Sequence, residues 1–520
     1  MASRWRRARM AVAAGALGSL LIGGAAAMAA PGGNGWNSAG GDRQNTRYAA
    51  NESKISPATV GGLTKKWELT TGGDVSATPA VDDQRVYVPD WAGNLYAVNR
   101  STGVAAWQRT ISSYTNVPGD RARATPALSD TSLVIGTQGP FGGGGAVLAI
   151  NKDTGALLWK TQLDRNPAAI ITQSATIHNG VVYVGTASLE EAFSVIPGYV
   201  CCSFRGSMAA LDLATGRVLW QTYLTPENFP GNAVWGSSPA VDVKRGSLYI
   251  ATGNNYNVPQ DTLDCVAGAA TLEAKAACLP ADDHFDSVVS LDLRTGAIKW
   301  ATRALPFDAW TVDCIPAIGD GQNCPEPAGP DYDFGQAPAL YSVKDSAGRA
   351  REFVGAGQKS GQYWALDPDT GAVRWVTQAG PGGIAGGLQW GSAVDGRRVY
   401  TANANSNQIP WGASGKTSGV WSALDAATGA RVWETRPEHG GGTSGPVTTA
   451  NGVVFGCALD PEGWMYALDA ATGAVLWSFA SGGSCLSGAA ISNGTVYWGS
   501  GYANNGFGTP NNKLYAFGLS

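Results

Sequence analysis

A short phrase, Ala-Leu-Asp-x-x-Thr-Gly-x-x-x-Trp, recurs along this chain and limits the folds open to it. Its clearest copy spans residues 467–477. Each copy predicts a strand, a tight turn in which glycine supplies a positive φ, and a second strand that opens near the tryptophan. Counting looser copies, the glycine stands four residues before a tryptophan at Gly103, Gly155, Gly216, Gly296, Gly371, Gly429 and Gly473. Seven copies indicate a repeat protein.

The two ends of the chain each hold part of one more copy. Trp67 has no lead-in strand or Thr-Gly pair, while residues 514–517 have the lead-in strand but neither turn nor tryptophan. Joined, these ends make an eighth copy, as in a β-propeller whose N-terminal strand completes its last blade and leaves no open edge. We therefore predict an all-β fold: an eight-bladed propeller of four-stranded antiparallel blades.

Composition agrees with this fold and excludes some partners. Only 15% of residues are charged, while 71 glycines and 19 tryptophans indicate many tight turns and bulky packing anchors. The net charge is -4 and no basic stripe is present. The chain therefore has no feature that attracts nucleic acid or an anionic membrane.

The N-terminus reads as a processing segment. Four arginines within residues 4–9 precede an apolar run over residues 10–27, and Ala27, Met28 and Ala29 suit a signal peptidase. We expect residues 1–29 to be a signal peptide, residues 30–520 to form the propeller, and the protein to be secreted or periplasmic with no membrane span after cleavage. The alternatives are a retained anchor, which the mildly apolar run disfavours, and a twin-arginine signal at Arg6 and Arg7, whose following residues fit that pattern poorly.

Because an exported protein reaches an oxidising compartment, we expect its eight cysteines to form disulfides. Connectivity cannot be read from sequence, so pairing between sequence neighbours is a hypothesis. It gives Cys201–Cys202, Cys265–Cys278, Cys314–Cys324 and Cys457–Cys485. The chain contains no C-x-x-C-H motif for covalent haem.

The spacing between copies indicates where function was added. Successive tryptophans are 40 residues apart between Trp67 and Trp107 but 80 apart between Trp220 and Trp300. Long loops on a rigid scaffold often carry function. Residues just ahead of the predicted inner strands should meet at one mouth of the channel, where polar and aromatic groups can form a ligand site. They are Arg123, Thr172, Gln173, Trp235, Gln336, Gln389, Trp390 and Thr443.

An eight-bladed ring with this repeat resembles the pyrroloquinoline-quinone (PQQ) dehydrogenases. Non-enzymatic propellers of the outer-membrane assembly type share the repeat, so a scaffold or interaction protein is the rival hypothesis. The segments between copies favour the enzyme. Asp331, in an Asp-Tyr-Asp-Phe segment, matches the family's catalytic base, and Lys359, in Gly-Gln-Lys-Ser-Gly, matches the basic residue on the quinone oxygens. Taken alone, the segment that contains Asp331 could be an ordinary turn, and Lys359 could be a solvated lysine at a strand end.

The resemblance also implies a Ca²⁺ site. Asn254, in Ala-Thr-Gly-Asn, matches a calcium-ligating asparagine, and Glu190 matches a calcium-ligating glutamate, with Glu191 as the alternative. With Asp331 they form a hard oxygen set that suits Ca²⁺, the cofactor supplying the remaining ligands. An outward-facing acidic pair is the other interpretation of Glu190 and Glu191.

Further residues match cofactor contacts less specifically. Thr172 falls where the family has a threonine on the cofactor, Arg123 can pair with a cofactor carboxylate, and Trp235 or Trp390 could cover the quinone or simply pack the scaffold. Many family members carry adjacent cysteines ahead of the arginine equivalent to Arg123, and here none precedes it. The adjacent pair, Cys201 and Cys202, lies after Glu191 instead, and whether it reaches the cofactor stays open.

This displaced pair, together with residues 233–239 and 327–334, looks most like the polyvinyl-alcohol dehydrogenase branch, here without the cytochrome domain that several members carry. The resemblance implies oxidation of secondary alcohols, polymers among them, to ketones. Asp331 would take the hydroxyl proton as hydride passes to the quinone, and electrons would leave to a separate carrier such as a cytochrome c. A PQQ dehydrogenase for sugars or primary alcohols is a further alternative.

Overall fold

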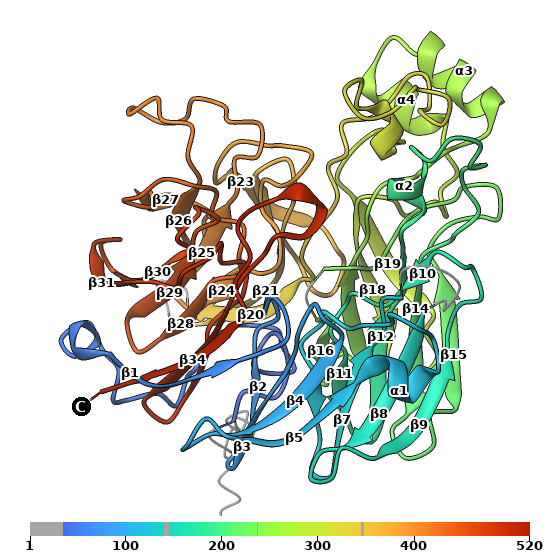
Figure 1. The fold of residues 1–520 in the computed structure, drawn as a ribbon. Coiled ribbons are helices and arrows are strands. Elements are labelled where there is room, and N and C mark those ends of the chain that lie inside the picture. Colours follow the sequence, from blue (N-terminus) through green and yellow to red (C-terminus); the bar gives the residue numbers. More distant parts are fainter. Residues whose placement is uncertain (1–34, 140–144, 237, 345–347, 520) are drawn as a thin grey trace, which may run out of the picture. The chain divides into compact units, whose positions relative to one another are not determined.

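Eight four-stranded antiparallel sheets follow one another around a ring in the computed structural model, which describes residues 35–139, 145–236, 238–344 and 348–519 (Figure 1). The predicted eight-bladed propeller is confirmed. The predicted signal peptide, residues 1–29, lies outside the described residues. Among the residues described, no helix is both long and apolar enough to cross a membrane.

Each blade runs from a short innermost strand to an outer strand. The first four blades are β2 (Ala80–Val81), β3 (Arg85–Pro89), β4 (Asn94–Asn99) and β5 (Ala105–Thr110); β6 (Ala127–Leu128), β7 (Ser132–Gly136), β8 (Ala146–Asn151) and β9 (Leu157–Gln162); β11 (Thr176–His178), β12 (Val181–Gly185), β14 (Ser207–Asp212) and β15 (Val218–Tyr223); and β16 (Ala240–Asp242), β17 (Ser247–Ala251), β18 (Ser287–Asp292) and β19 (Ile298–Arg303). A two-stranded sheet pairs β10 (Ala169–Ile170) with β13 (Ala187–Ser188).

The remaining blades repeat this order. They are β20 (Ala339–Lys344), β21 (Ala350–Gly357), β22 (Gln362–Leu366) and β23 (Val373–Gln378); β24 (Ala393–Val394), β25 (Arg398–Asn403), β26 (Val420–Asp425) and β27 (Arg431–Thr435); β28 (Thr448–Ala450), β29 (Val453–Cys457), β30 (Trp464–Asp469) and β31 (Val475–Ala480); and β32 (Ala490–Ser492), β33 (Thr495–Ser500), β34 (Lys513–Gly518) and β1 (Thr64–Thr70). Because β1 pairs with β34, the N-terminal strand closes the ring as predicted.

The repeated phrase forms the contact between neighbouring blades. Gly296 has φ +71°, and a Cβ built there would lie 2.5 Å from the ring of Trp220 in the preceding blade. The indole Nε1 of Trp220 donates a hydrogen bond to the carbonyl of Leu293 at 3.1 Å, beside the same turn. Glycine is therefore required twice, for its conformation and for the space that the indole fills. In the other copies, the glycine of the Thr-Gly pair contacts the tryptophan of the preceding copy in the same way.

An N-terminal inner segment, residues 36–48, hydrogen-bonds the innermost strands of six blades. Its backbone carbonyls accept from Val81, Leu128, Val241, Leu340, Val394 and Thr449, at 2.7–3.0 Å. Because the innermost strands surround the axis, a segment that bonds so many of them lies in the channel. No sequence pattern pointed to it.

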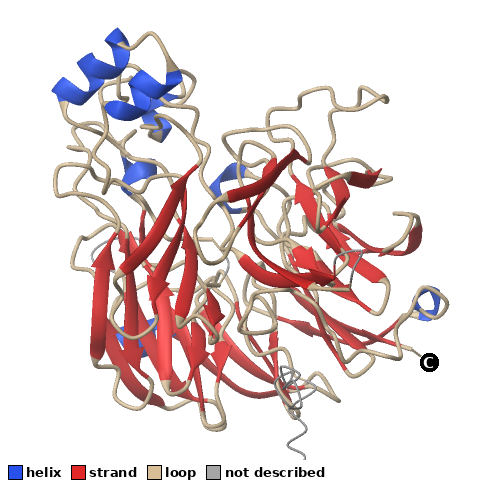
Figure 2. Ribbon diagram, turned by 180° about the vertical axis from the view of Figure 1, so that it is seen from behind, coloured by secondary structure: helices blue, strands red, loops and turns tan. Residues whose placement is uncertain are grey.

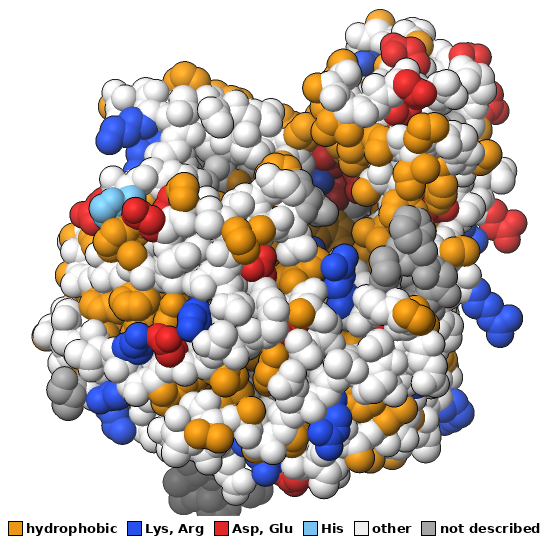
Figure 3. All heavy atoms as spheres, viewed as in Figure 1, with side chains coloured by type: hydrophobic (Ala, Val, Ile, Leu, Met, Phe, Trp, Pro, Cys, Tyr) orange, Lys and Arg blue, Asp and Glu red, His pale blue; other side chains and the backbone are white. Residues whose placement is uncertain are grey.

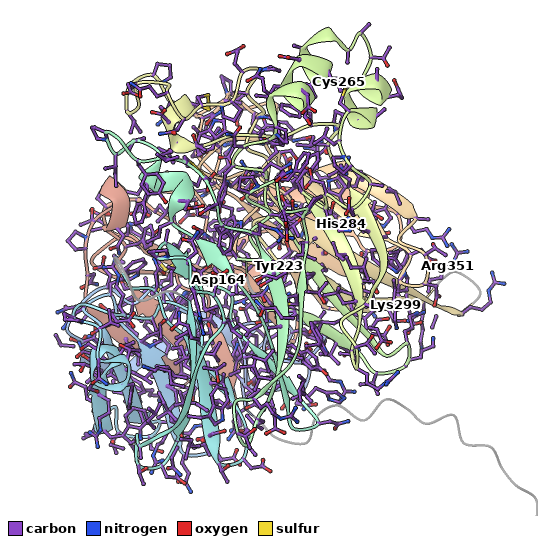
Figure 4. The ribbon with its side chains drawn as sticks, turned by 90° about the vertical axis from the view of Figure 1, so that its right-hand side faces the viewer. Asp164, Tyr223, Cys265, His284, Lys299 and Arg351 are labelled. Atoms are coloured by element: carbon purple, nitrogen blue, oxygen red, sulfur yellow. A yellow bond between two sulfur atoms is a disulfide. The ribbon has the colours of Figure 1, made fainter. Side chains whose placement is uncertain are left out.

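The helices lie in the loops. They are α1 (Ile111–Thr115), α2 (Glu190–Phe193), α3 (Gln260–Gly268) and α4 (Leu272–Ala277), with 3₁₀ turns η1 (Val60–Gly62), η2 (Val312–Cys314) and η3 (Asn504–Gly506). Helices α3 and α4 lie beyond the strand ends (Figure 2). Cys265 lies among them, and His284 marks the return toward β18 (Figure 4). All four disulfides have the predicted pairing, and Cys265–Cys278 joins α3 to the end of α4.

Candidate functional site

Three of the predicted site segments follow the second strand of a blade. Glu190 and Glu191 come after β12, Asn254 after β17, and Lys359 after β21. Because the blades are equivalent, the second strands end at one edge of the ring, and these side chains meet there. On the face shown in Figure 3, a hollow contains acidic and basic atoms and is bordered by apolar surface.

Asp331 and Lys359 form a buried ion pair. Lys359 Nζ lies 2.7 Å from Asp331 Oδ1, with 8% and 2% of the two side chains exposed. Burial raises the pKa of Asp331 well above its usual range, Lys359 opposes this shift, and the carboxylates of Asp333 and Glu191 add to it. Burial disfavours the Lys359 ammonium, but the same three carboxylates raise the pKa of Lys359 and keep it charged. A carboxylate whose proton affinity is raised suits general base chemistry.

Asp333 is the residue that links the parts of the site, and it was not assigned a role from sequence. Its Oδ2 accepts the indole N–H of Trp235 at 2.8 Å and lies 3.4 Å from Lys359 Nζ. Its Oδ1 accepts the backbone N–H of Asn254 at 3.0 Å. A Cβ at Gly253 would lie 2.9 Å from Asp333 Oδ2, so this approach requires glycine there. Asp333 is the second aspartate of the Asp-Tyr-Asp-Phe segment, so the motif that pointed to Asp331 could also have pointed to it.

The side chain of Asn254 is held with its oxygen as the remaining acceptor. Its Nδ2 donates to the carbonyls of Asn255 and Trp310 at 3.0 and 2.9 Å. The residue is 1% exposed. This orientation leaves Oδ1 as the atom that can bind a cation.

Glu190 and Glu191 have different surroundings. The carboxylate of Glu190 accepts the backbone N–H groups of Ser203 and Phe204 at 2.8 and 2.7 Å, and also hydrogen bonds from Asn166, Ser203 and Tyr199 side chains. Glu191 Oε1 is buried with no hydrogen-bond partner in the described part of the chain. Burial raises the pKa of Glu191 to about 8; Lys359 lowers it, while Asp333 and Asp308 raise it. The structure thus brings Glu191 to the carboxylate cluster and uses Glu190 to hold the loop that carries the cysteines.

Arg123, Thr172 and Trp390 line a cavity of about 50 Å³ in the channel. Arg123 lies over the ring of Trp390, 4.2 Å from its centroid, and makes no hydrogen bond to any described residue. Thr172 donates to the carbonyl of Trp235 at 3.3 Å. The rings of Trp235 and Trp390 meet edge to face with centroids 5.1 Å apart.

Cys201 and Cys202 lie beside the same group of residues. Cys202 packs against the apolar cluster that includes Phe204 and Tyr256, and Trp235 packs against that cluster too. The backbone N–H of Cys201 donates to Asn323 Oδ1 at 3.4 Å, and its Sγ lies 3.9 Å from the carbonyl oxygen of Glu190. The disulfide is therefore near Trp235, on the side of the site formed by the loop after α2.

Two more buried carboxyl groups, Asp308 and Asp286, lie behind Asp331. Asp308 accepts the backbone N–H groups of Asp331 and Tyr332 at 3.1 and 2.8 Å. Asp286 is 0% exposed. Burial raises the pKa of Asp308 to about 6. Neither residue was identified from sequence, because both lie more than twenty positions from Asp331 and no local pattern joins them.

The side-chain oxygens at this site supply only part of the ligand set that a hard cation needs. Within the ranges that the structure describes, no three Asp, Glu, His or Cys side chains converge closely enough to hold a metal ion. The unpartnered Oε1 of Glu191 and the oriented amide of Asn254 are nevertheless oxygen ligands without another role. A metal here needs further ligands from outside this protein chain, such as oxygens of a bound cofactor.

Comparison with known proteins places the chain in a family. The family model described as "Outer membrane protein assembly factor BamB" matches residues 64–302 and 359–517. A polyvinylalcohol dehydrogenase of Sphingopyxis sp. (strain 113P3) is 32% identical over 77% of this chain and 58% of its own length, and one from a Pseudomonas species is 30% identical over 76% and 58%. The chain thus spans little more than half the length of these curated relatives.

Solved structures support the same fold. The quinohemoprotein alcohol dehydrogenase of Comamonas testosteroni superposes with a TM-score of 0.70 at 19% identity, over 94% of this chain and 80% of that one. At this identity the likeness establishes the propeller and no more. The chain belongs to the propeller family of the model that matches residues 64–302 and 359–517, and within it the chain is similar in sequence to the polyvinylalcohol dehydrogenases.

Proposed function

We propose that this protein is a PQQ- and Ca²⁺-dependent dehydrogenase that oxidises secondary alcohols, polymeric ones included, to ketones and passes the electrons to a separate carrier such as a cytochrome c. Secretion or a periplasmic location suits such a reaction. The observation that carries the proposal is the buried pair of Asp331 and Lys359, 2.7 Å apart, beside Glu191 and Asn254.

One further observation favours the enzyme over a scaffold. The matching family model skips residues 303–358, between its two matched parts. Asp308, Asp331 and Asp333 all lie in that skipped stretch. Buried carboxylates in a segment outside the shared repeat support a chemical role, because burying charge costs stability that a scaffold has no reason to give up.

The cofactor would be held by residues that now contact one another. Arg123 would pair with a carboxylate of PQQ, Thr172 would bond its edge, and Trp235 or Trp390 would cover a face. Cys202, which packs against the same apolar cluster as Trp235, would border the site. Asn254 Oδ1, Glu191 and Asp331 would ligate Ca²⁺ with oxygens of the cofactor. When bound, PQQ supplies the two-electron acceptor and Ca²⁺ the Lewis acid that polarises it.

The chain's own residues would then prepare the alcohol for oxidation. Asp331 accepts the hydroxyl proton as the carbinol carbon gives up its hydrogen, and its burial makes it a better proton acceptor than an exposed aspartate. Lys359 stays charged beside it and stabilises negative charge that develops at the reaction centre. Asp333 fixes Trp235 and Lys359 in place through the contacts described above.

The surface near the site supports a chain-like substrate. Ile196, Val200 and Ile318 are 40%, 90% and 59% exposed, on the loop that follows α2 and on the loop that follows η2. Asn323 joins the two loops by donating to the carbonyls of Ser194 and Tyr199. Exposed apolar side chains next to a polar site can hold the carbon backbone of a polyalcohol while one hydroxyl reaches Asp331.

The test is reconstitution. Purified protein should oxidise a secondary alcohol or polyvinyl alcohol with an artificial dye acceptor only when PQQ and Ca²⁺ are both added, with Mg²⁺ and La³⁺ as comparison cations. Asp331→Asn should lower kcat by about 10³-fold, since a general base contributes on that order. Activity without PQQ, or full activity in the variant, would refute the mechanism. A panel with sugars and primary alcohols separates the alternative substrates.

The family model's description keeps a scaffold protein as the second candidate. A titration with PQQ distinguishes the two functions without turnover. A dehydrogenase should show a bound-quinone absorbance and a raised melting temperature, because a ligand that binds only the folded state stabilises it. Absence of both signals would favour the scaffold.

A further inference from the structure

Asp331 has a backbone conformation that needs external support. Its φ is +57°, in the left-handed region that non-glycine residues seldom occupy. Such conformations persist only where the surroundings hold them, and they are frequent at functional sites. The ion pair with Lys359 fixes the side chain of Asp331 but does not fix its backbone.

The carboxylate of Asp308 provides that support. One oxygen accepts the N–H of Asp331 at 3.1 Å and the other accepts the N–H of Tyr332 at 2.8 Å. The preceding loop closes around the same group, because a Cβ at Gly329 would lie 2.1 Å from Asp308 Oδ1. Gly329 also donates its N–H to the carbonyl of Ala309 at 2.8 Å. Asp308 therefore holds the loop at residues 329–332 in the conformation that presents Asp331.

We propose that Asp308 is the positioning residue for the base Asp331, because its carboxylate holds the backbone of the loop that carries Asp331. This rests on the proposed function, since it assumes that Asp331 is the base. Asp308 acts through the backbone, so its replacement should change the placement of Asp331 and leave the cofactor contacts unchanged.

The experiment compares two variants of the full chain reconstituted with PQQ and Ca²⁺. Asp308→Asn keeps one acceptor but presents an NH₂ group to the second backbone N–H. Asp283→Asn is the matched control, because Asp283 is also fully buried and accepts hydrogen bonds from Thr225, Asn232 and Asn255, away from Asp331.

Turnover is the first measurement. Asp308→Asn should lower kcat by about 10- to 100-fold, since a small misplacement of a reacting group has that effect. KM and the PQQ dissociation constant should stay within about twofold of wild type. Asp283→Asn should leave kcat near wild type. Unchanged kcat in Asp308→Asn, or an equal loss in Asp283→Asn, would overturn the proposal.

Amide hydrogen exchange is the second measurement and does not depend on activity. The peptide that contains Asp331 and Tyr332 should exchange about tenfold faster in Asp308→Asn than in wild type, because one backbone hydrogen bond is lost. Asp283→Asn should leave that peptide unchanged. If the wild-type protein proves inactive, the proposed function fails, while exchange still decides whether Asp308 holds this loop. Unchanged exchange in Asp308→Asn would overturn the positioning role.

Discussion

The blade interfaces and the candidate site differ in how their contacts are built. At the interfaces one contact recurs: a tryptophan ring lies on the Thr-Gly turn of the next blade, as Trp220 does on Gly296 and Trp300 on Gly371. At the site no contact recurs. Asp331 and Asp333 are buried around the ammonium of Lys359, and the half-buried Glu191 adds a third negative charge. The repeated tryptophan–glycine contacts stabilise the ring through apolar packing. The segments that do not repeat bring charged side chains together, and burying these charges costs stability until a ligand binds.

The largest expected effect separates the two adjacent glutamates. Glu191→Gln should lower Ca²⁺ affinity by about 100-fold or more, because loss of even an outer residue around a metal has effects of that order. Glu190→Gln should preserve Ca²⁺ affinity but lower the free energy of unfolding by about 1–3 kcal/mol, since its acceptors for Ser203 and Phe204 are weakened. Calorimetric Ca²⁺ titration of PQQ-loaded protein and chemical denaturation measure the two. If Glu190→Gln lowered the Ca²⁺ affinity and Glu191→Gln did not, Glu190 would be the metal ligand instead.

The second prediction concerns one blade interface. Gly296→Ala should lower the free energy of unfolding by about 2–4 kcal/mol, because a methyl group would collide with Trp220 and the backbone φ is positive. Gly268→Ala is the matched control: no atom lies within 4 Å of its added Cβ, and it stands in helix α3. Denaturant titration should find the control as stable as wild type. Equal stability of the two variants would mean that the indole contact contributes little.

The third prediction uses the buried carboxyl groups at the site. Their pKa values are raised in the folded state, to about 6 for Asp308 and about 8 for Glu191, by burial first of all. The folded protein then binds more protons than the unfolded chain between pH 5 and 8, so stability falls as pH rises through this window. For Asp308 alone the effect is of the order of 3 kcal/mol over the whole titration, and about half of it falls between pH 5 and 8.

Thermal unfolding of metal-free protein should therefore give a melting temperature that decreases from pH 5 to pH 8. Addition of PQQ and Ca²⁺ should raise the melting temperature most at pH 8, where the carboxylates are free to bind the cation. A melting temperature that rises with pH in the metal-free protein would contradict the crowded-carboxylate description.

The smallest effect separates two copies of the same interface. Trp159 Nε1 donates to the carbonyl of Leu213 at 2.8 Å, whereas Trp375 Nε1 is buried without a partner among the described residues. Trp159→Phe should therefore cost about 1 kcal/mol more than Trp375→Phe, the net contribution of one hydrogen bond. Urea denaturation of both variants measures the difference. Equal costs would show that only the ring contact matters.

The fold was largely predictable because its signal repeats. Eight tryptophans predicted eight blades, and the incomplete copies at Trp67 and residues 514–517 predicted the closure by β1 and β34. Pairing of neighbouring cysteines was confirmed as well. The inner segment at residues 36–48 was not predictable, because it carries no periodic pattern. Its backbone carbonyls and the side chains of Asn45 and Arg47 contact residues that lie far away in the sequence.

The site was predictable only where a segment kept a family pattern. Asp331, Lys359 and Asn254 were identified by their motifs, and the structure places all three around Asp333. The choice between Glu190 and Glu191 depends on how the first turn of α2 is oriented, which spacing alone does not determine. Asp308 contacts the loop of Asp331 only after two separate segments fold together, so nothing local marks it.

The inner segment and the strand that closes the ring also determine when the molecule can finish folding. During synthesis, residues 36–48 emerge early, but their partners extend to Thr449, and β1 must wait for residues 513–518. Both ends of the nascent chain therefore stay without their final partners until almost the whole chain exists. A product that stops short of β34 leaves β33 and β1 in the last blade without the strand that joins them, which favours aggregation over a working ring. The closure thus acts as a check on chain completeness.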